Sequence, residues 1–249
     1  MRKLVLLTND DGFGAPGIQA LRRELCPEWD TVMVAPDREQ SAQSHALTLN
    51  RPLRVNSVSE GVFSVDGTPT DCMMIALRGG IIDRAPELAI SGLNHGANLG
   101  DDVIYSGTVA GAAEATLLGL PSIAVSMVEP DSTDLVQAAK ITLMIVRAVI
   151  RYSLPHGVFL NVNIPSSWSG GKFEITCQGT RVYRDVITEK VDPRGRPYYW
   201  IGGKLEKISG AESSDVAAID RGNVSITPLH LDMTATHVLK EMESWDFER

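Results

Sequence analysis

The sequence is poor in cysteine and contains no long uninterrupted hydrophobic run. Its 249 residues include only three cysteines, which are far apart: Cys26, Cys72 and Cys177. That number and spacing give neither a disulfide framework nor a CxxC zinc site, and are typical of a reducing compartment. The apolar run near the N-terminus has only about five residues, too few for a signal-peptide core. Arg147 interrupts the apolar stretch at 141–150, which falls short of the roughly 20 residues that a membrane span needs. We therefore expect a cytoplasmic protein with no membrane partner.

Positive charge is also in the minority. The chain has 23 Lys and Arg against 31 Asp and Glu, which gives a net charge of -8. An acidic surface repels a phosphate backbone, so we expect no nucleic-acid partner. A small anionic substrate remains compatible with this charge, because one bound cation can reverse the local field. The apolar share of 43% and the charged share of 22% are ordinary for a globular protein.

The first two thirds of the chain alternate between strand-like and helix-like segments. The expected strands are near-continuous apolar runs at 3–8, 31–36, 87–92, 122–128 and 157–165. The expected helices lie at 15–25, 70–80, 106–120 and 134–154. Pro16 falls in the first turn of the first helix, and Thr70 or Asp71 lies near the N-cap of the second. This alternation predicts an α/β fold with a mostly parallel sheet and helices on both faces.

The pattern changes after Pro165. Segments 173–179, 181–192 and 196–207 look like strands, with a turn at 192–195 between the last two. A further strand is expected at 222–234 and a short helix at 237–247. A two-stranded arm of this length is marginal alone in water, so it should pack on the core or on another subunit. We expect a catalytic core at 1–165 and a C-terminal region at 166–249 that belongs to the same domain.

Two adjacent carboxylates, Asp10 and Asp11, follow the first strand at the edge where parallel sheets bind ligands. Neighbouring carboxylates repel, and the pKa of one is raised, unless a cation lies beside them. A hard ion such as Mg²⁺ prefers carboxylate, hydroxyl and amide oxygens, and no Cys or His cluster favours zinc. The alternative is that one aspartate caps helix 15–25 while the other is solvated.

Other polar clusters follow the second and third strands. The glycines in "GLNHGANLG", at 92–100, would let backbone N–H groups approach a phosphate. The stretch Ser106–Gly107–Thr108 begins the third helix and could bind an anion, although plain N-capping by Ser106 or Thr108 is the commoner use. His45 could hydrogen-bond a leaving group or act as a general acid, or be an incidental loop histidine.

Several motifs together resemble the SurE survival-protein family of metal-dependent 5′-nucleotidases. The matching runs are "TNDDGFGAPGIQAL", "VAPDREQSAQSHALTL", "GTPTDC", "SGLNHGANLGDDVIYSGTVAGAAEA", "DPRGRPYYWIG" and "GNVSITPLHLDMT". They occur in the family's order from near residue 1 to about 234. The resemblance implies a Rossmann-like core, and dimers or tetramers built partly through the C-terminal β-arm.

The resemblance also implies a site and an activity. One divalent cation per subunit, Mg²⁺ or Mn²⁺, would be held by Asp10, Asp11, Ser41 and Asn94. Asn98 and the stretch Ser106–Thr108 would face the substrate phosphate. The implied reaction is hydrolysis of nucleoside 5′-monophosphates, with 3′-nucleotides and short-chain polyphosphate as further substrates. Either Asp10 or Asp11 would orient or deprotonate the water, and a covalent aspartyl-phosphate stays open.

Three other classes of protein share some of these features. A dinucleotide-dependent oxidoreductase should carry GxGxxG after the first strand, where this chain has "NDDGFG". A haloacid-dehalogenase-type phosphatase needs two aspartates one residue apart, and here they are adjacent. A catalytically silent nucleotide-binding or sensor protein stays open, because binding and catalysis use the same groups.

Overall fold

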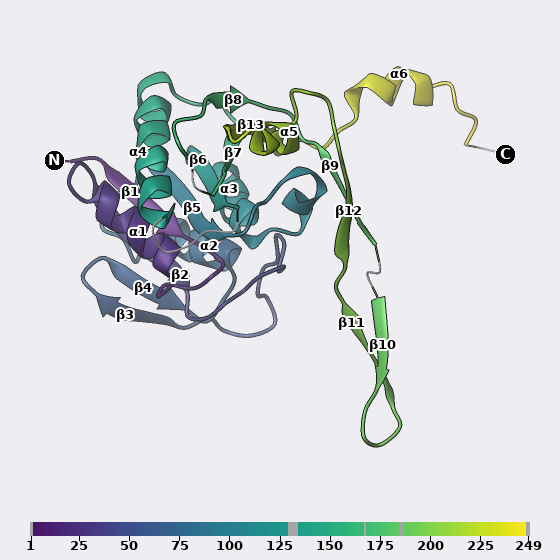
Figure 1. Ribbon diagram of the computed structural model, residues 1–249. Helices are drawn as coiled ribbons and strands as arrows, with labels where there is room; N and C mark the ends of the chain where they lie inside the picture. Colours follow the sequence, from purple (N-terminus) through teal and green to yellow (C-terminus); the bar gives the residue numbers. More distant parts are fainter. Residues whose placement is uncertain (1, 129–133, 167, 185–186, 248–249) are drawn as a thin grey trace.

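The computed structural model describes residues 2–128, 134–166, 168–184 and 187–247. A nine-stranded sheet forms its centre, in the order β3-β4-β2-β1-β5-β6-β7-β13-β8 (Figure 1). The strands are β1 (Leu4–Thr8), β2 (Asp30–Pro36), β3 (Val55–Ser59), β4 (Val62–Val65), β5 (Leu88–His95), β6 (Ser122–Met127), β7 (Val158–Ile164), β8 (Phe173–Ile175) and β13 (Val224–His230). Six neighbouring strands of the sheet run parallel to one another: β4, β2, β1, β5, β6 and β7. The mixed α/β fold with a mostly parallel sheet is therefore confirmed.

Helices cover both faces of the sheet, because successive side chains of a buried strand point to opposite sides. Val5 and Leu7 pack into one core cluster with residues of α1 (Pro16–Leu25) and α4 (Asp134–Tyr152). Leu4 and Leu6 pack into a second cluster with residues of α2 (Pro69–Arg78) and α3 (Gly107–Leu117). In the described part of the chain, no helix combines the length and apolar character that a membrane crossing requires.

Two features at one end of the sheet add to the sequence prediction. Strands β3 and β4 were not predicted, because β4 has four residues and β3 is largely exposed and pairs only at the sheet edge. The N-cap of α2 is Thr68, so Thr70 and Asp71 lie near the N-cap as expected, in the first turn. Thr68 Oγ1 accepts from the Asp71 N–H at 3.1 Å, and the Asp71 carboxylate accepts from the Thr68 N–H at 2.9 Å. This reciprocal capping box places Asp71 at the third helical position.

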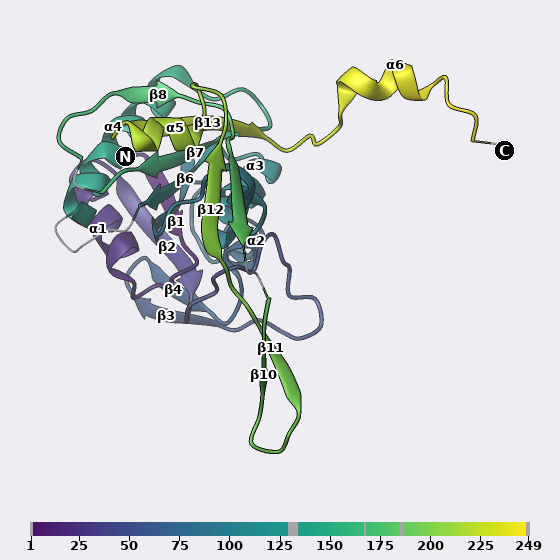
Figure 2. The ribbon, with the colours of Figure 1, turned by 45° about the vertical axis from the view of Figure 1, so that its right-hand side comes forward.

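A long two-stranded β-arm extends away from the sheet (Figures 1 and 2). Its strands are β9 (Thr180–Arg184), β10 (Ile187–Val191), β11 (Pro197–Ile201) and β12 (Lys204–Ser209). β9 pairs with β12 and β10 pairs with β11, both antiparallel. The strands expected at 181–192 and 196–207 each correspond to two of these, and residues 185–186 lie outside the described residues.

The C-terminal segment returns to the sheet and then leaves it. β13 pairs antiparallel with β7 and parallel with β8, and the short helix α5 (Asp215–Asp220) precedes it. The helix expected at 237–247 is shorter: η2 (Thr236–Val238) is followed by α6 (Leu239–Met242). None of the residues in these two helices is buried, and without tertiary packing a short helix has little to stabilise it. The tail extends away from the body in both views (Figures 1 and 2).

Candidate active site

The acidic pair lies where β1 ends at the carboxyl edge of the sheet. Asp10 is buried, while Asp11 is partly exposed. The turn after them is closed by Asn9, whose Nδ2 donates to the Gly12 carbonyl at 2.9 Å. The N-cap of α1 is Ala15, with no side-chain hydrogen bond at the cap. Neither aspartate therefore caps that helix, and the alternative of an ordinary capping role is wrong.

Asp10 is hydrogen-bonded to the start of α3. Its carboxylate accepts hydrogen bonds from the Thr108 backbone N–H, at 3.1 Å, and from the Thr108 hydroxyl. A Cβ added at Gly107 would lie 3.0 Å from the Asp10 side chain, so glycine permits this close contact. Burial raises the pKa of Asp10 to about 6, and the charge of Asp11 adds to this, while the Thr108 hydrogen bonds oppose it.

Asp11 lies at the end of β5 and close to another carboxylate, that of Glu39. Its Oδ2 accepts from the His95 backbone N–H at 3.2 Å, at the end of β5. Burial raises the pKa of Asp11, the His95 N–H opposes the rise, and the negative charge of Glu39 adds to it. Glu39 was not predicted from the sequence. It also accepts a 2.9 Å hydrogen bond from the Ser41 hydroxyl.

The other two expected metal ligands are Ser41 and Asn94. Each is next in the chain to a residue whose backbone N–H donates to Asp10 or Asp11. The N–H of Gln40 donates to the Asp10 carbonyl at 2.7 Å, and Asn94 precedes His95. Asn94 Nδ2 donates to the Gly96 carbonyl at 2.7 Å, so the amide oxygen is the atom of this side chain that could contact a cation.

The donor set suits a hard cation better than zinc. The described residues contain no group of three or more His, Cys, Asp or Glu that could hold a metal ion. A cation beside Asp10 and Asp11 would therefore need neutral oxygen donors, such as the Ser41 hydroxyl and the Asn94 amide oxygen. Carboxylate, hydroxyl and amide oxygens are the ligands that Mg²⁺ and Mn²⁺ take.

The start of α3 is where the sequence predicts an anion site, a capped helix end, or both. Ser106 is the N-cap, and its Oγ accepts from the Val109 N–H at 3.0 Å. Capping by Ser106 is therefore confirmed, whereas the Thr108 hydroxyl is used on Asp10. Two N–H groups of this helix start are already bonded, Thr108 to Asp10 and Val109 to Ser106, so a phosphate here would meet the N–H of Gly107 or displace one of these bonds.

Asn98 is held rigidly by three polar residues of the neighbouring strands. Its Nδ2 donates to Ser126 Oγ at 2.7 Å, and its N–H donates to Asn163 Oδ1 at 2.8 Å. Its carbonyl accepts from Asn161 and Asn163 at 2.9 and 3.0 Å. These partners were not predicted from the sequence. The signal for them is the alternation of Asn161 and Asn163 in the apolar strand β7, with Ser126 near the end of β6.

His45 contacts a buried acid that the sequence analysis also missed. His45 Nε2 lies 2.8 Å from Glu114 Oε2 on α3, and the Glu114 side chain is 3% exposed. Ser44, next to His45, donates from its hydroxyl to the Ile104 carbonyl at 2.7 Å and from its N–H to the Tyr105 carbonyl. Because Tyr105 precedes the N-cap Ser106, these bonds hold Ser44 beside the start of α3, and the His45 side chain contacts Glu114 farther along the helix. The signal for Glu114 is that it is the only charged residue between 106 and 117.

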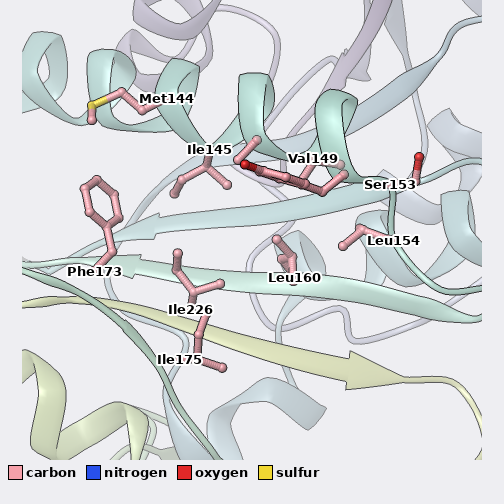
Figure 3. Close-up of a pocket in the computed structure, with 11 residues that line it drawn as sticks. Met144, Ile145, Val149, Ser153, Leu154, Leu160, Phe173, Ile175 and Ile226 are labelled. Carbon is pink, nitrogen blue, oxygen red and sulfur yellow. The ribbon is translucent and has the colours of Figure 1, made fainter.

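An apolar cavity of about 440 Å³ lies elsewhere, between α4 and the sheet (Figure 3). Its walls include Ile145, Val149, Leu160, Phe173 and Ile226. Almost all of its lining is aliphatic or aromatic, so it lacks the convergent polar groups that phosphate chemistry needs. The polar site at the carboxyl edge of β1, β2 and β5 is therefore the candidate active site.

The fold and this site define a doubly wound α/β protein whose polar residues gather at the carboxyl ends of the strands, where proteins of this class bind ligands. A family model described as "Survival protein SurE" matches residues 5–185. Two relatives named "5'-nucleotidase SurE" match nearly the full length. The one from Pelobacter propionicus is 48% identical, covering 98% of this chain and 99% of its own. The one from Geotalea uraniireducens is 47% identical, covering 97% and 98%.

A solved structure agrees with these relatives. The crystal structure of the SurE protein from Aquifex aeolicus is similar with a TM-score of 0.85 and 40% identity, covering 96% of this chain and 98% of its own. The chain belongs to the SurE family. The resemblance stated from the sequence motifs is thereby confirmed.

Proposed function

We propose that this chain is a divalent-metal-dependent phosphatase that hydrolyses nucleoside 5′-monophosphates to nucleoside and phosphate. One observation carries the proposal: the Thr108 N–H and hydroxyl both bond to Asp10. This contact brings an acidic pair suited to a cation against a helix start suited to a phosphate. Relatives named 5'-nucleotidase, 46–48% identical over nearly the whole chain, support the same activity.

The proposed ligands of one cation per subunit are Asp10, Asp11, Ser41 and Asn94. A bound Mg²⁺ or Mn²⁺ would stabilise negative charge on the phosphoryl oxygens. The raised pKa values of Asp10 and Asp11 support this assignment, because burying two adjacent carboxylates is unfavourable without a positive partner.

The chain's own residues would then position the substrate and the water. Ser106, Gly107 and Thr108 lie at the helix start that would bind the remaining phosphoryl oxygens, with Asn98 at the same edge. Asp10 or Asp11 would accept a proton from the attacking water or orient it. His45 would lie on the side of the leaving nucleoside.

The central test is phosphate release from AMP and GMP, measured with and without Mn²⁺ or Mg²⁺. The proposal predicts release that depends on the added metal and is abolished by excess chelator. 3′-AMP and short-chain polyphosphate, tested in the same assay, would show whether they are further substrates. Nucleotide binding without release under any metal condition would contradict the proposal, and would support a silent nucleotide-binding or sensor protein.

We also propose a cytoplasmic homodimer or homotetramer assembled through the β-arm. The three cysteines are all free, which suits a reducing compartment. The arm exposes large apolar side chains: Ile187, Val191, Tyr199, Trp200 and Ile201. Clustered exposed apolar surface of this kind marks an interaction site. The net charge of -8 gives no support for a nucleic-acid partner.

A further inference from the structure

Glu114 is a buried acid in an unusual place. It lies in the middle of α3, whose other residues are small or uncharged, and its side chain is 3% exposed. Its Oε2 is 2.8 Å from His45 Nε2, while its Oε1 has no hydrogen-bond partner among the described residues. A buried carboxylate is unfavourable unless a cation or several donors pair with it. The partner that Glu114 has here is the imidazole of His45.

The position of Glu114 on α3 points toward the candidate active site. Glu114 follows Gly107 by seven residues, or two helical turns, so both lie on the same face of the helix. Gly107 is the residue that packs against Asp10. Helical side chains lean toward the N-terminus, so the carboxylate of Glu114 is directed back toward the Asp10 end of α3.

The loop that carries His45 is anchored to the same end of the helix. The bonds from Ser44 to Ile104 and Tyr105 fix the chain just before Ser106. From there, the His45 side chain reaches along α3 to Glu114. The side chain of His45 is 39% exposed. With Nε2 bound to the carboxylate, Nδ1 is the nitrogen left for a ligand, and a carboxylate in this position fixes the orientation of the ring.

We infer that Glu114 is a positioning residue that holds His45 so that Nδ1 donates a proton to the nucleoside oxygen leaving the phosphorus. This inference rests on the proposed function. Glu114 itself touches no substrate and acts through His45. The sequence offered His45 as one candidate among loop histidines, and the buried carboxylate is what distinguishes it.

Water forms a new bond to phosphorus and loses a proton to Asp10 or Asp11. The bond between phosphorus and the 5′-oxygen breaks, and its electron pair stays on that oxygen. The imidazolium Nδ1–H of His45 gives its proton to the oxygen, so the nucleoside leaves as an alcohol instead of an alkoxide. Glu114 stays bound at Nε2, the ring regains its proton from solvent, and the aspartate releases to solvent the proton that it took from water.

Two substrates with different leaving groups test this role. A nucleoside alkoxide is a poor leaving group and needs the proton, whereas p-nitrophenolate is a stable anion that does not. His45→Gln should lower kcat on AMP by about 100-fold or more, the range of general acid catalysis, and change kcat on p-nitrophenyl phosphate by less than about tenfold. Glu114→Gln should show the same selectivity with a smaller loss on AMP, about tenfold.

The double variant separates a positioning role from an independent one. If Glu114 acts only through His45, His45→Gln combined with Glu114→Gln should be no slower on AMP than His45→Gln alone. His156→Gln is the matched control, because His156 is an exposed histidine just before β7, at the opposite edge of the sheet. It should change neither substrate. His45 is partly exposed, so its variant keeps the test valid even if Glu114→Gln destabilises the fold.

Each of the following results would overturn the inference. Equal losses on both substrates would mean a structural role for the pair. A rise in KM for AMP with kcat unchanged would mean that His45 contacts the nucleoside without donating a proton. A wild-type protein that hydrolyses neither substrate with Mn²⁺ or Mg²⁺ would remove the proposed function as well. If the wild type hydrolyses both substrates and the variants leave the ratio of the two rates unchanged, this inference alone is overturned.

Discussion

At the scale of single residues, Asp10 combines burial, a neighbouring like charge and contact with a helix start. Burial raises its pKa to about 6. A proton therefore stays on Asp10 in the folded chain at pH values where the unfolded chain, in which the pKa of aspartate has its ordinary value of 3.8, has released it. The resulting stability is fully present below about pH 4 and is lost as the pH rises through about 6.

A bound cation should reverse this trend. Above pH 6 Asp10 is ionised in the folded protein and attracts the cation, whereas at pH 5 a proton competes for the same oxygens. We predict that Mn²⁺ raises the melting temperature more at pH 7.5 than at pH 5. Thermal unfolding at both pH values, with Mn²⁺ or with EDTA, measures the difference. An equal shift at the two pH values would argue against Asp10 as a ligand.

At the scale of elements, α3 is built to approach the sheet closely. A Cβ added at Gly111 would lie 2.7 Å from Ser91 Oγ and 3.1 Å from Thr8 Cγ2, both buried side chains beneath the helix. Glycine is therefore required here by packing. The same closeness lets Thr108 reach Asp10, so the packing of α3 and the geometry of the site depend on each other.

Gly111→Ala should consequently destabilise the protein by about 1–3 kcal/mol through overpacking. In an unhindered helix the same change stabilises by about 1 kcal/mol, so the sign of the effect is informative. Denaturant unfolding measures it. Gly14→Ala is the control, because nothing lies within 4 Å of a Cβ at that position. If Gly111→Ala is as stable as the wild type, the contact between α3 and the sheet can accept an added methyl group, and the packing argument is wrong.

The sequence could predict the main strands and helices of the core, because buried parallel strands are continuous apolar runs and caps are local. It could not predict β3 or β4, whose pairing is set by neighbours distant in the chain. For the candidate site, adjacent polar residues such as Asp10 and Asp11 were readable as a motif. Glu39, Ser126 and Glu114 were not, because their partners come together only in the folded sheet.

At the scale of the whole molecule, the β-arm is connected to the candidate site. Buried Asp215 accepts from the Gly100 N–H at 2.8 Å and from the Gly179 N–H at 2.7 Å. Gly100 follows Asn98 by two residues, and Gly179 precedes the first arm strand. Buried carboxylates with several backbone donors hold segments firmly. An assembly through the arm would therefore also support the loop that carries Asn98.

The arm should be the interface between subunits. Trp200 and Ile201 are 62% and 81% exposed in the single chain, so replacing them with serine should leave the subunit folded. We predict that Trp200→Ser combined with Ile201→Ser lowers the molar mass measured by light scattering after size exclusion. Val58→Ser, at an exposed apolar residue of the edge strand β3, is the control. An oligomer that survives the double substitution would place the interface elsewhere.

The central claim is that the site around Asp10 hydrolyses nucleotides. The most direct measurement is phosphate release from AMP by Asp10→Asn and Asp11→Asn over a range of Mn²⁺ concentrations, with circular dichroism to confirm folding. Asp83→Asn is the control, because Asp83 is exposed before β5 at the opposite edge of the sheet. We expect Asp10→Asn to be folded and to lose at least about 100-fold in rate at every metal concentration, while Asp83→Asn matches the wild type. Full activity of Asp10→Asn at saturating Mn²⁺ would contradict it.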